Sequence, residues 1–255
     1  MYGPMRPGVV QEAQLQRQLL WLKESWLWQL DHRVIAPRDQ GKARLTALDL
    51  GCGPGLVMEL LASRFAVKGL DIDRDLVKHC QARGLDVIQG DAAHLPFASG
   101  SFDIAYCSFL LLWMTEPKKV MAEMERVSRQ WVICLAEPDY GARIDHPAEL
   151  EVLKQRAIEG LEREGADPLI GRKLRSLFSA CGLEAEIGVH PGVWGLERLR
   201  QEGKEEFRTI ENALGPAMDG AEKEQLRAAW ERACRQGSLF QFNPIFYAFA
   251  QKRVP

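Results

Sequence analysis

The sequence has little that would tie the protein to a nucleic acid or to a metal ion. Lys and Arg total 33 against 35 Asp and Glu, for a net charge of −2, and no Lys/Arg-rich run is present that could follow a phosphate backbone. The five histidines lack the H-x-x-x-H spacing of a metal site, and Asp71, Asp73 and Asp75 lack the Gly and Glu positions of a calcium loop. We therefore expect no nucleic-acid partner and no bound metal.

The chain also lacks the features of a secreted or membrane protein. No Cys-x-x-Cys pair, N-terminal apolar segment, long membrane span, internal repeat or low-complexity tract is visible. The cysteines lie far apart, at Cys52, Cys80, Cys107, Cys134, Cys181 and Cys234. We expect a protein of the reducing cytoplasm that does not bind membranes.

A glycine-rich turn is the most informative feature that is present. An apolar strand over residues 45–48 leads into Gly51, Gly53 and Gly55, and a helix is predicted over residues 56–64. Glycines at such a turn let backbone N–H groups approach a ligand in front of a helix N-terminus, which indicates a nucleotide-type cofactor. The third glycine of a dinucleotide fingerprint would fall on Leu56, so the spacing argues against NAD or FAD.

Three further motifs follow in the order that a β-α-β fold requires. A second strand, residues 66–70, ends at Asp71, and a third strand, residues 86–89, leads into Gly90-Asp91-Ala92-Ala93-His94-Leu95-Pro96-Phe97. Ser101-Phe102-Asp103 then opens a fourth strand over residues 104–108. Taken singly, Asp71 could cap the next helix, although Asp73 is better placed for that, and Asp91 could form an Asx turn.

Taken together, L-D-x-G-C-G-x-G, G-x-D, G-D-A-x-x-L-P-F and S-F-D resemble the class I S-adenosylmethionine-dependent methyltransferases that act on small molecules. The resemblance covers residues 45 to about 138. It implies an α/β fold with a doubly wound, seven-stranded, mostly parallel Rossmann-like sheet in strand order 3-2-1-4-5-7-6. The last strand would be antiparallel, and the cofactor would be S-adenosyl-L-methionine, with S-adenosyl-L-homocysteine as product.

The resemblance also implies which residues contact the cofactor. Asp49 would reach the methionine ammonium, Asp71 would hold the ribose hydroxyls, and Asp91 would accept from the adenine amino group. Ile72 would pack on the adenine. The full set of implied contacts is Asp49, Gly51, Cys52, Gly53, Gly55, Asp71, Ile72, Asp91, Ala92, Cys107 and Ser108.

With 255 residues and 46% hydrophobic content, the chain is read as one methyltransferase domain. Residues 1–44 are predicted to form a helix, over residues 11–32, and a linker. Residues 45–190 would form strands one to six, and residues 238–255 the final strand. Residues 191–237 form an insertion with an amphipathic helical pattern, which indicates a helical cap or a dimer surface. We therefore treat a homodimer as possible.

The acceptor site is expected where the carboxyl ends of strands four and five meet the cofactor. The residues predicted to line it are Phe109, Trp113, Glu137, Asp139, Tyr140 and Trp194. His146, His190 and Tyr140 are the candidates for acid–base catalysis. For both histidines, a surface or structural role is the competing interpretation.

The sequence favours methyl transfer to a small molecule without identifying the acceptor atom. A catalytically silent subunit that binds S-adenosylmethionine, and an enzyme that methylates a protein or tRNA, are the main alternatives. An NAD(P)-dependent oxidoreductase is opposed by Leu56.

Overall fold

A computed structural model describes residues 10–37, 43–191 and 218–252, with side chains from residue 15 onward. Between residues 192 and 217 it describes isolated positions, namely 195, 197, 201, 203, 204, 207, 208, 210 and 211. All statements below refer to these residues. Within them, no helix combines the length and the apolar character that crossing a bilayer requires.

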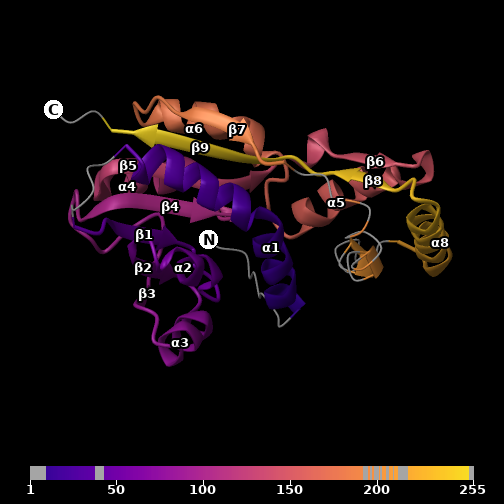
Figure 1. The fold of residues 1–255 in the computed structure, drawn as a ribbon, viewed down its shortest axis with the longest axis horizontal. Helices are drawn as coiled ribbons and strands as arrows, with labels where there is room; N and C mark the ends of the chain where they lie inside the picture. Colours follow the sequence, from indigo (N-terminus) through magenta and orange to yellow (C-terminus); the bar gives the residue numbers. More distant parts are fainter. Residues whose placement is uncertain are drawn as a thin grey trace.

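The centre of the fold is a seven-stranded sheet in the order β3-β2-β1-β4-β5-β9-β7 (Figure 1). Its strands are β1 (Thr46–Leu50), β2 (Ala66–Asp71), β3 (Val87–Gln89), β4 (Phe102–Ser108), β5 (Ser128–Pro138), β7 (Glu186–Val189) and β9 (Ile245–Gln251). β9 runs antiparallel to both of its neighbours, β5 and β7, while the pairs from β3 to β5 are parallel. The predicted sheet and its strand order are confirmed.

Helices cover both faces of the sheet. On one face, α4 (Pro117–Val127) and α6 (Leu174–Ala180) pack over β4, β5 and β9. On the other face lie α1 (Val10–Leu30) and the apolar side of α2 (Leu56–Leu61), while α3 (Arg74–Ala82) packs beside β2 and β3. The shorter turns are η1 (Asp31–Ile35), η2 (Leu111–Trp113), η3 (Tyr140–Ala142), η4 (Ala148–Leu150) and η5 (Ile170–Lys173).

The N-terminal helix was predicted from its apolar spacing and is present as α1. Leu22, Trp26 and Leu30 recur at helical spacing and are buried against the sheet. Figure 1 shows the helix starting beside the carboxyl ends of the strands and running back across the sheet. Trp28, off this stripe, is 54% exposed.

The structure corrects the predicted final strand within residues 238–255, which is two strands. β8 (Phe240–Phe242) leaves the main sheet and pairs antiparallel with β6 (Ile144–His146), and β9 starts only after Asn243-Pro244. Proline has no N–H to give to a sheet, so the chain changes partner where the sequence has Pro244.

β6, β8, α5 (Val152–Arg163) and α8 (Gly220–Gln236) form a lobe at one end of the sheet (Figure 1). Because β8 immediately precedes the antiparallel β9, the lobe lies beyond the carboxyl ends of the parallel strands. It has its own apolar cluster, in which the buried Trp230 donates from Nε1 to the carbonyl of Gly203 at 2.8 Å. The insertion therefore contributes a helix to a lobe beside the edge where a cofactor would bind.

Candidate active site

The glycine turn after β1 has the geometry that close backbone approach requires. Gly53 has φ +52°, and a Cβ added there would meet nothing within 4 Å, whereas one on Gly51 would lie 2.6 Å from Leu110 Cδ1. The Gly53 N–H donates to Asp71 Oδ2 at 2.8 Å, and its carbonyl accepts from the Cys80 thiol at 3.3 Å. Asp71 and Cys80 thus hold Gly53 through hydrogen bonds, and the space into which a Gly53 side chain would project is open.

Asp71, at the end of β2, does more than the sequence suggested. Its second oxygen, Oδ1, accepts from the N–H of Asp73 at 2.9 Å, so the carboxylate joins the glycine turn to the start of α3. Burial raises the pKa of Asp71, while its bonds to the N–H groups of Asp73 and Gly53 act in the opposite direction. Asp73 caps α3 as predicted, accepting from Asp75 N at 2.8 Å. Asp71 therefore also has a structural role.

Asp49 carries a buried polar atom without a partner. Its Oδ2 and the hydroxyl of Tyr106, its register neighbour on β4, are both buried and make no hydrogen bond within the described residues. Burial raises the pKa of Asp49 well above its usual range, and the nearby Tyr106 hydroxyl offsets part of that rise without reaching hydrogen-bonding geometry. Such an orphaned acceptor is typical of a site that receives a donor from a ligand or water.

The loop after β3 supplies the next predicted contacts. Asp91 forms an Asx turn, with Oδ1 accepting from Ala93 N at 2.8 Å, and its Oδ2 lies 3.0 Å from His94 Nδ1. Ala92 is buried, whereas Ile72, which follows β2, is 51% exposed. An exposed isoleucine directly after β2 presents an apolar surface on which an adenine ring can pack.

The exit from β4 is strained. Phe109 has φ +52°, which is uncommon for a bulky residue, and its N–H donates to the carbonyl of Ala136 on β5 at 2.8 Å. Just before it, the Ser108 Oγ atom is buried without a partner in the described part of the chain. Phe109 and Trp113, half-buried, follow this exit at the carboxyl edge of the sheet.

Glu137 differs from its predicted role in the acceptor site because it is fully buried. Its Oε1 accepts from Leu110 N at 2.9 Å and Leu111 N at 2.7 Å, and its Oε2 accepts from Leu112 N at 3.3 Å. Burial raises the pKa of Glu137 to about 8, although these three N–H groups favour the ionised form. The residue holds the loop that carries Phe109 and Trp113, rather than lining an open pocket.

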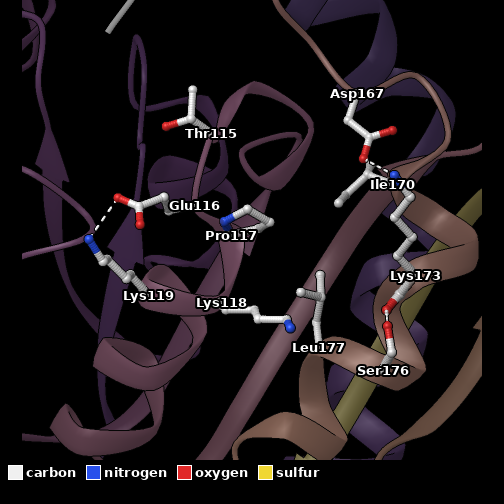
Figure 2. Close-up of a pocket in the computed structure, with 10 residues that line it drawn as sticks. All are labelled: Thr115, Glu116, Pro117, Lys118, Lys119, Asp167, Ile170, Lys173, Ser176 and Leu177. Carbon is white, nitrogen blue, oxygen red and sulfur yellow. Dashed lines mark hydrogen bonds and ion pairs between the residues drawn. The ribbon is translucent and has the colours of Figure 1, made fainter. Parts of the chain in front are cut away.

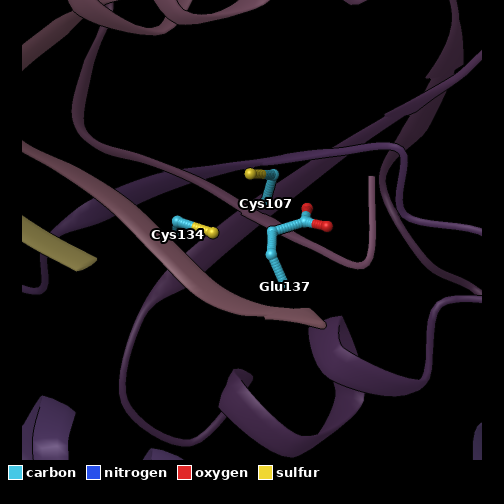
Figure 3. Close-up of side chains that lie close together, drawn as sticks. All are labelled: Cys107, Cys134 and Glu137. Atoms are coloured by element: carbon cyan, nitrogen blue, oxygen red, sulfur yellow. The ribbon is translucent and has the colours of Figure 1, made fainter. Parts of the chain in front are cut away.

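Figure 3 shows Glu137 beside Cys107 and Cys134, whose sulfur atoms come from the paired strands β4 and β5. The three potential ligand atoms lie within 4.8 Å of one another. Both Glu137 oxygens, however, already accept backbone N–H groups, and burial raises the pKa of the Cys134 thiol well above its usual range. Since metals bind thiolates, we assign this cluster to packing.

Asp139 is also engaged within the protein. Arg172 donates to it through two nitrogens, at 2.6 Å and 2.8 Å, and the N–H of Gly141 adds a third bond at 3.1 Å. The bidentate guanidinium and the Gly141 N–H thus fix the position of this carboxylate. Next to it, the half-buried Tyr140 follows β5 at the same edge of the sheet as Trp113.

The two histidines predicted as catalytic candidates lie in different parts of the fold. His190 is 1% exposed and lies between Ser25 Oγ on α1 and the carbonyl of Leu135 on β5, at 2.7 Å from each. Burial lowers its pKa to about 4, although the Leu135 carbonyl favours the charged form. His190 therefore anchors α1, which argues against catalysis. His146 is exposed on β6 in the lobe, and Trp194 lies outside the described residues.

A separate hollow of about 420 Å³ lies between the start of α4 and the η5–α6 segment (Figure 2). Its walls include two ion pairs, Lys119 with Glu116 and Lys173 with Asp167. None of the residues predicted for the cofactor or the acceptor lines it, so it does not extend the site described above.

The raised pKa of Glu137 predicts a pH-dependent stability. Because the folded protein retains a proton that the unfolded chain releases, Glu137 contributes less stability as pH rises from its usual pKa toward 8. Relative to Glu137→Gln, wild type should lose up to about 1.4 kcal/mol per pH unit between pH 6 and 8. Denaturant unfolding of both proteins across this range measures the difference, and parallel curves would contradict the prediction.

Comparison with known proteins agrees with this geometry. Residues 48–135 match the family model described as a methyltransferase domain. A demethylmenaquinone methyltransferase of Renibacterium salmoninarum is 41% identical over 85 residues, covering 32% of this chain and 36% of that protein. A fatty-acid O-methyltransferase of Mycolicibacterium smegmatis is 32% identical over 148 residues, covering 51% and 52% respectively. The chain thus spans about half or less of these relatives' length.

The fold is shared with a putative methyltransferase from Bacillus halodurans, whose structure matches with a TM-score of 0.57 at 16% identity, over 84% of this chain and 94% of that one. At this identity the match shows the fold alone. The family model covers the glycine turn, the Asp71 and Asp91 motifs and β4. Residues 48–135 therefore match a methyltransferase domain, and the chain has a fold that a putative methyltransferase shares.

Proposed function

We propose that this protein transfers a methyl group from S-adenosylmethionine to a small-molecule acceptor. The observation that carries the proposal is the turn at Gly53, fixed from behind by Asp71 and open where a side chain would project. Asp49, Asp71 and Asp91 lie at the carboxyl ends of three neighbouring strands, β1, β2 and β3. That edge is where a doubly wound sheet binds its ligand.

The residues present fit the cofactor. A carboxylate has about four acceptor positions, so Asp71 can bond both backbone N–H groups and still accept two ribose hydroxyls. The unpartnered Asp49 Oδ2 can accept from the methionine ammonium, and Ile72 offers an exposed surface to the adenine. Asp91 would accept from the adenine amino group, with Ala92 beside the ring.

When bound, the cofactor supplies an electrophilic methyl on a sulfonium, so the protein's main task is to orient the acceptor. We assign that task to Phe109, Trp113 and Tyr140, the half-buried aromatic residues at the exits of β4 and β5. Aromatic walls favour an acceptor with an apolar body. The names of the quinone- and fatty-acid-modifying relatives support the same choice.

The six cysteines, all unpaired, support the reducing cytoplasm as the compartment we propose. Cys52, Cys80, Cys107 and Cys134 are moreover buried, the first of them within the glycine turn. Oxidation to disulfides is therefore not part of how this fold is stabilised.

Calorimetry with S-adenosylhomocysteine and S-adenosylmethionine tests the cofactor assignment. Both should bind the purified protein, while NAD and NADP should give no comparable heat, since Leu56 stands where their third glycine is needed. Tight binding of NADH without a response to the sulfur compounds would overturn the proposal. Transfer of a labelled methyl to a panel of quinones and fatty acids then searches for the acceptor.

Replacing Asp71 with Ala should weaken both binding and folding. The ribose loses charge-assisted bonds, typically ~1.5–3 kcal/mol each, so the Kd for S-adenosylhomocysteine should rise at least about tenfold. The melting temperature should fall as well, because the N–H groups of Gly53 and Asp73 lose their acceptor. Asp75→Ala, at an exposed position of α3, is the control and should change neither. An unchanged Kd in Asp71→Ala would leave this residue a structural role alone.

Trp113→Ala and Tyr140→Ala should keep S-adenosylhomocysteine binding within a few fold but depress methyl transfer. Lost orientation penalises the transition state more than the cofactor complex. Trp28→Ala, on the exposed face of α1, should leave transfer unchanged. A crystal structure with S-adenosylhomocysteine gives an independent check, since Trp113 and Tyr140 should border one cavity that reaches the sulfur. Side chains turned away from the sulfur would remove them from the acceptor site.

A further inference from the structure

The loop that follows β3, residues 91–97, makes few hydrogen bonds with its own backbone. Asp91 closes its first turn through Ala93 N and through a backbone bond from His94 N at 3.0 Å. Beyond this turn, the N–H of Leu95 and the carbonyls of Leu95 and Phe97 bond to side chains of α4. We call residues 91–97 the adenine loop, since the proposed function places the adenine against Asp91 and Ala92.

Two residues of α4, Glu123 and Arg126, form hydrogen bonds with the backbone at the C-terminal end of the adenine loop. Glu123 Oε2 accepts from Leu95 N at 2.7 Å. Arg126 donates to the carbonyl of Phe97 at 2.7 Å and to that of Leu95 at 3.2 Å. One N–H and two carbonyls of an irregular segment are thereby satisfied by side chains rather than by a neighbouring strand.

The two side chains also hold each other. Arg126 donates through Nε and Nη2 to the two oxygens of Glu123, each at 2.7 Å, across one turn of the helix. This hydrogen bonding lowers the pKa of Glu123 and so keeps it ionised at neutral pH. The side chains are 19% and 33% exposed, which makes the pair less screened by solvent than an ordinary surface ion pair.

Apolar contacts fix the same end of the loop. Leu95 is buried in the cluster that includes α4, and the Phe97 ring meets Phe102 of β4 edge-on, with centroids 5.0 Å apart. The adenine loop is attached to β3 at its start and to α4 near its end, so the conformation of the loop depends on both attachments. A shift at Leu95 would be transmitted along a short stretch of chain to Asp91 and Ala92.

We infer that Glu123 and Arg126 are positioning residues for recognition of the cofactor's adenine, acting through the backbone of the adenine loop. This inference rests on the proposed function. Neither residue is required to touch the cofactor. They set where the Asp91 carboxylate and the Ala92 N–H stand, and thus how well the site distinguishes an adenine amino group from another substituent.

The test compares S-adenosylhomocysteine with S-inosylhomocysteine, which has an oxo group in place of the adenine amino group. Wild type should prefer the adenosyl compound by at least about tenfold, because Asp91 can accept from the amino group but meets an acceptor in the inosyl compound. In Arg126→Ala the preference should fall toward onefold, while affinity for the inosyl compound changes little. Calorimetry measures both affinities.

The chain offers a matched control in Glu116 and Lys119, which form an ion pair at the same spacing on α4 but are 61% and 53% exposed. Glu116→Gln and Lys119→Ala should leave both the affinities and their ratio unchanged. Arg126→Lys, which keeps the charge but loses the fork of donors, should give an intermediate preference. Glu123→Gln should do the same. If Arg126→Ala does not fold, the preference for the adenosyl compound in Arg126→Lys and Glu123→Gln tests the inference.

A purely structural pair would give a different result. If the affinities for both compounds fall together and their ratio is preserved in the folded variants, the inference is overturned, and it is equally overturned if neither affinity changes. Failure of wild type to bind S-adenosylhomocysteine would instead refute the proposed function. The two failures are therefore distinguishable.

Discussion

Carboxylates that accept backbone N–H groups hold the carboxyl edge of this sheet together. Asp71 accepts an N–H of the glycine turn, Glu137 accepts N–H groups that follow the exit of β4, and Glu123 accepts an N–H near the end of the adenine loop. Irregular loops have N–H groups that no strand satisfies, and the oxygen atoms of these acidic side chains accept them. The positions of the proposed cofactor and acceptor contacts depend on these few side chains.

This construction places carboxyl groups where burial disfavours their charged form. Asp71 and Glu137 have raised pKa values because both are taken out of water, and N–H groups offset only part of the cost. Glu123 avoids the cost by remaining near the surface and pairing with Arg126. Burying Asp71 and Glu137 therefore fixes the local geometry but lowers the stability of the folded state through desolvation. The Glu123–Arg126 pair holds the adenine loop with less desolvation.

The fold was predictable because its signals are local. Strand β1, the three glycines and Asp71 lie close together in the chain, and the strand order follows once the family resemblance is stated. What each polar residue does depends on partners far along the chain. Glu137 meets Leu110–Leu112, and His190 meets Ser25 and Leu135, and neither pairing leaves a mark in the sequence. Likewise Glu123-x-x-Arg126 reads as an ordinary helical ion pair, since its backbone partners belong to another loop.

The lobe shows a related limit. Pro244 signalled an interruption, but the sequence could not show that the chain on its N-terminal side pairs with β6. The chain thus passes from the lobe through β8 into β9, and α5 and α8 lie on the side of the sheet where the parallel strands end (Figure 1). The proposed cofactor contacts lie on the strands and on the loops that the carboxyl groups hold, so loops in the lobe can vary without moving them. Under the proposed function, acceptor specificity can therefore change in the lobe and at the β4 and β5 exits without disturbing the glycine turn.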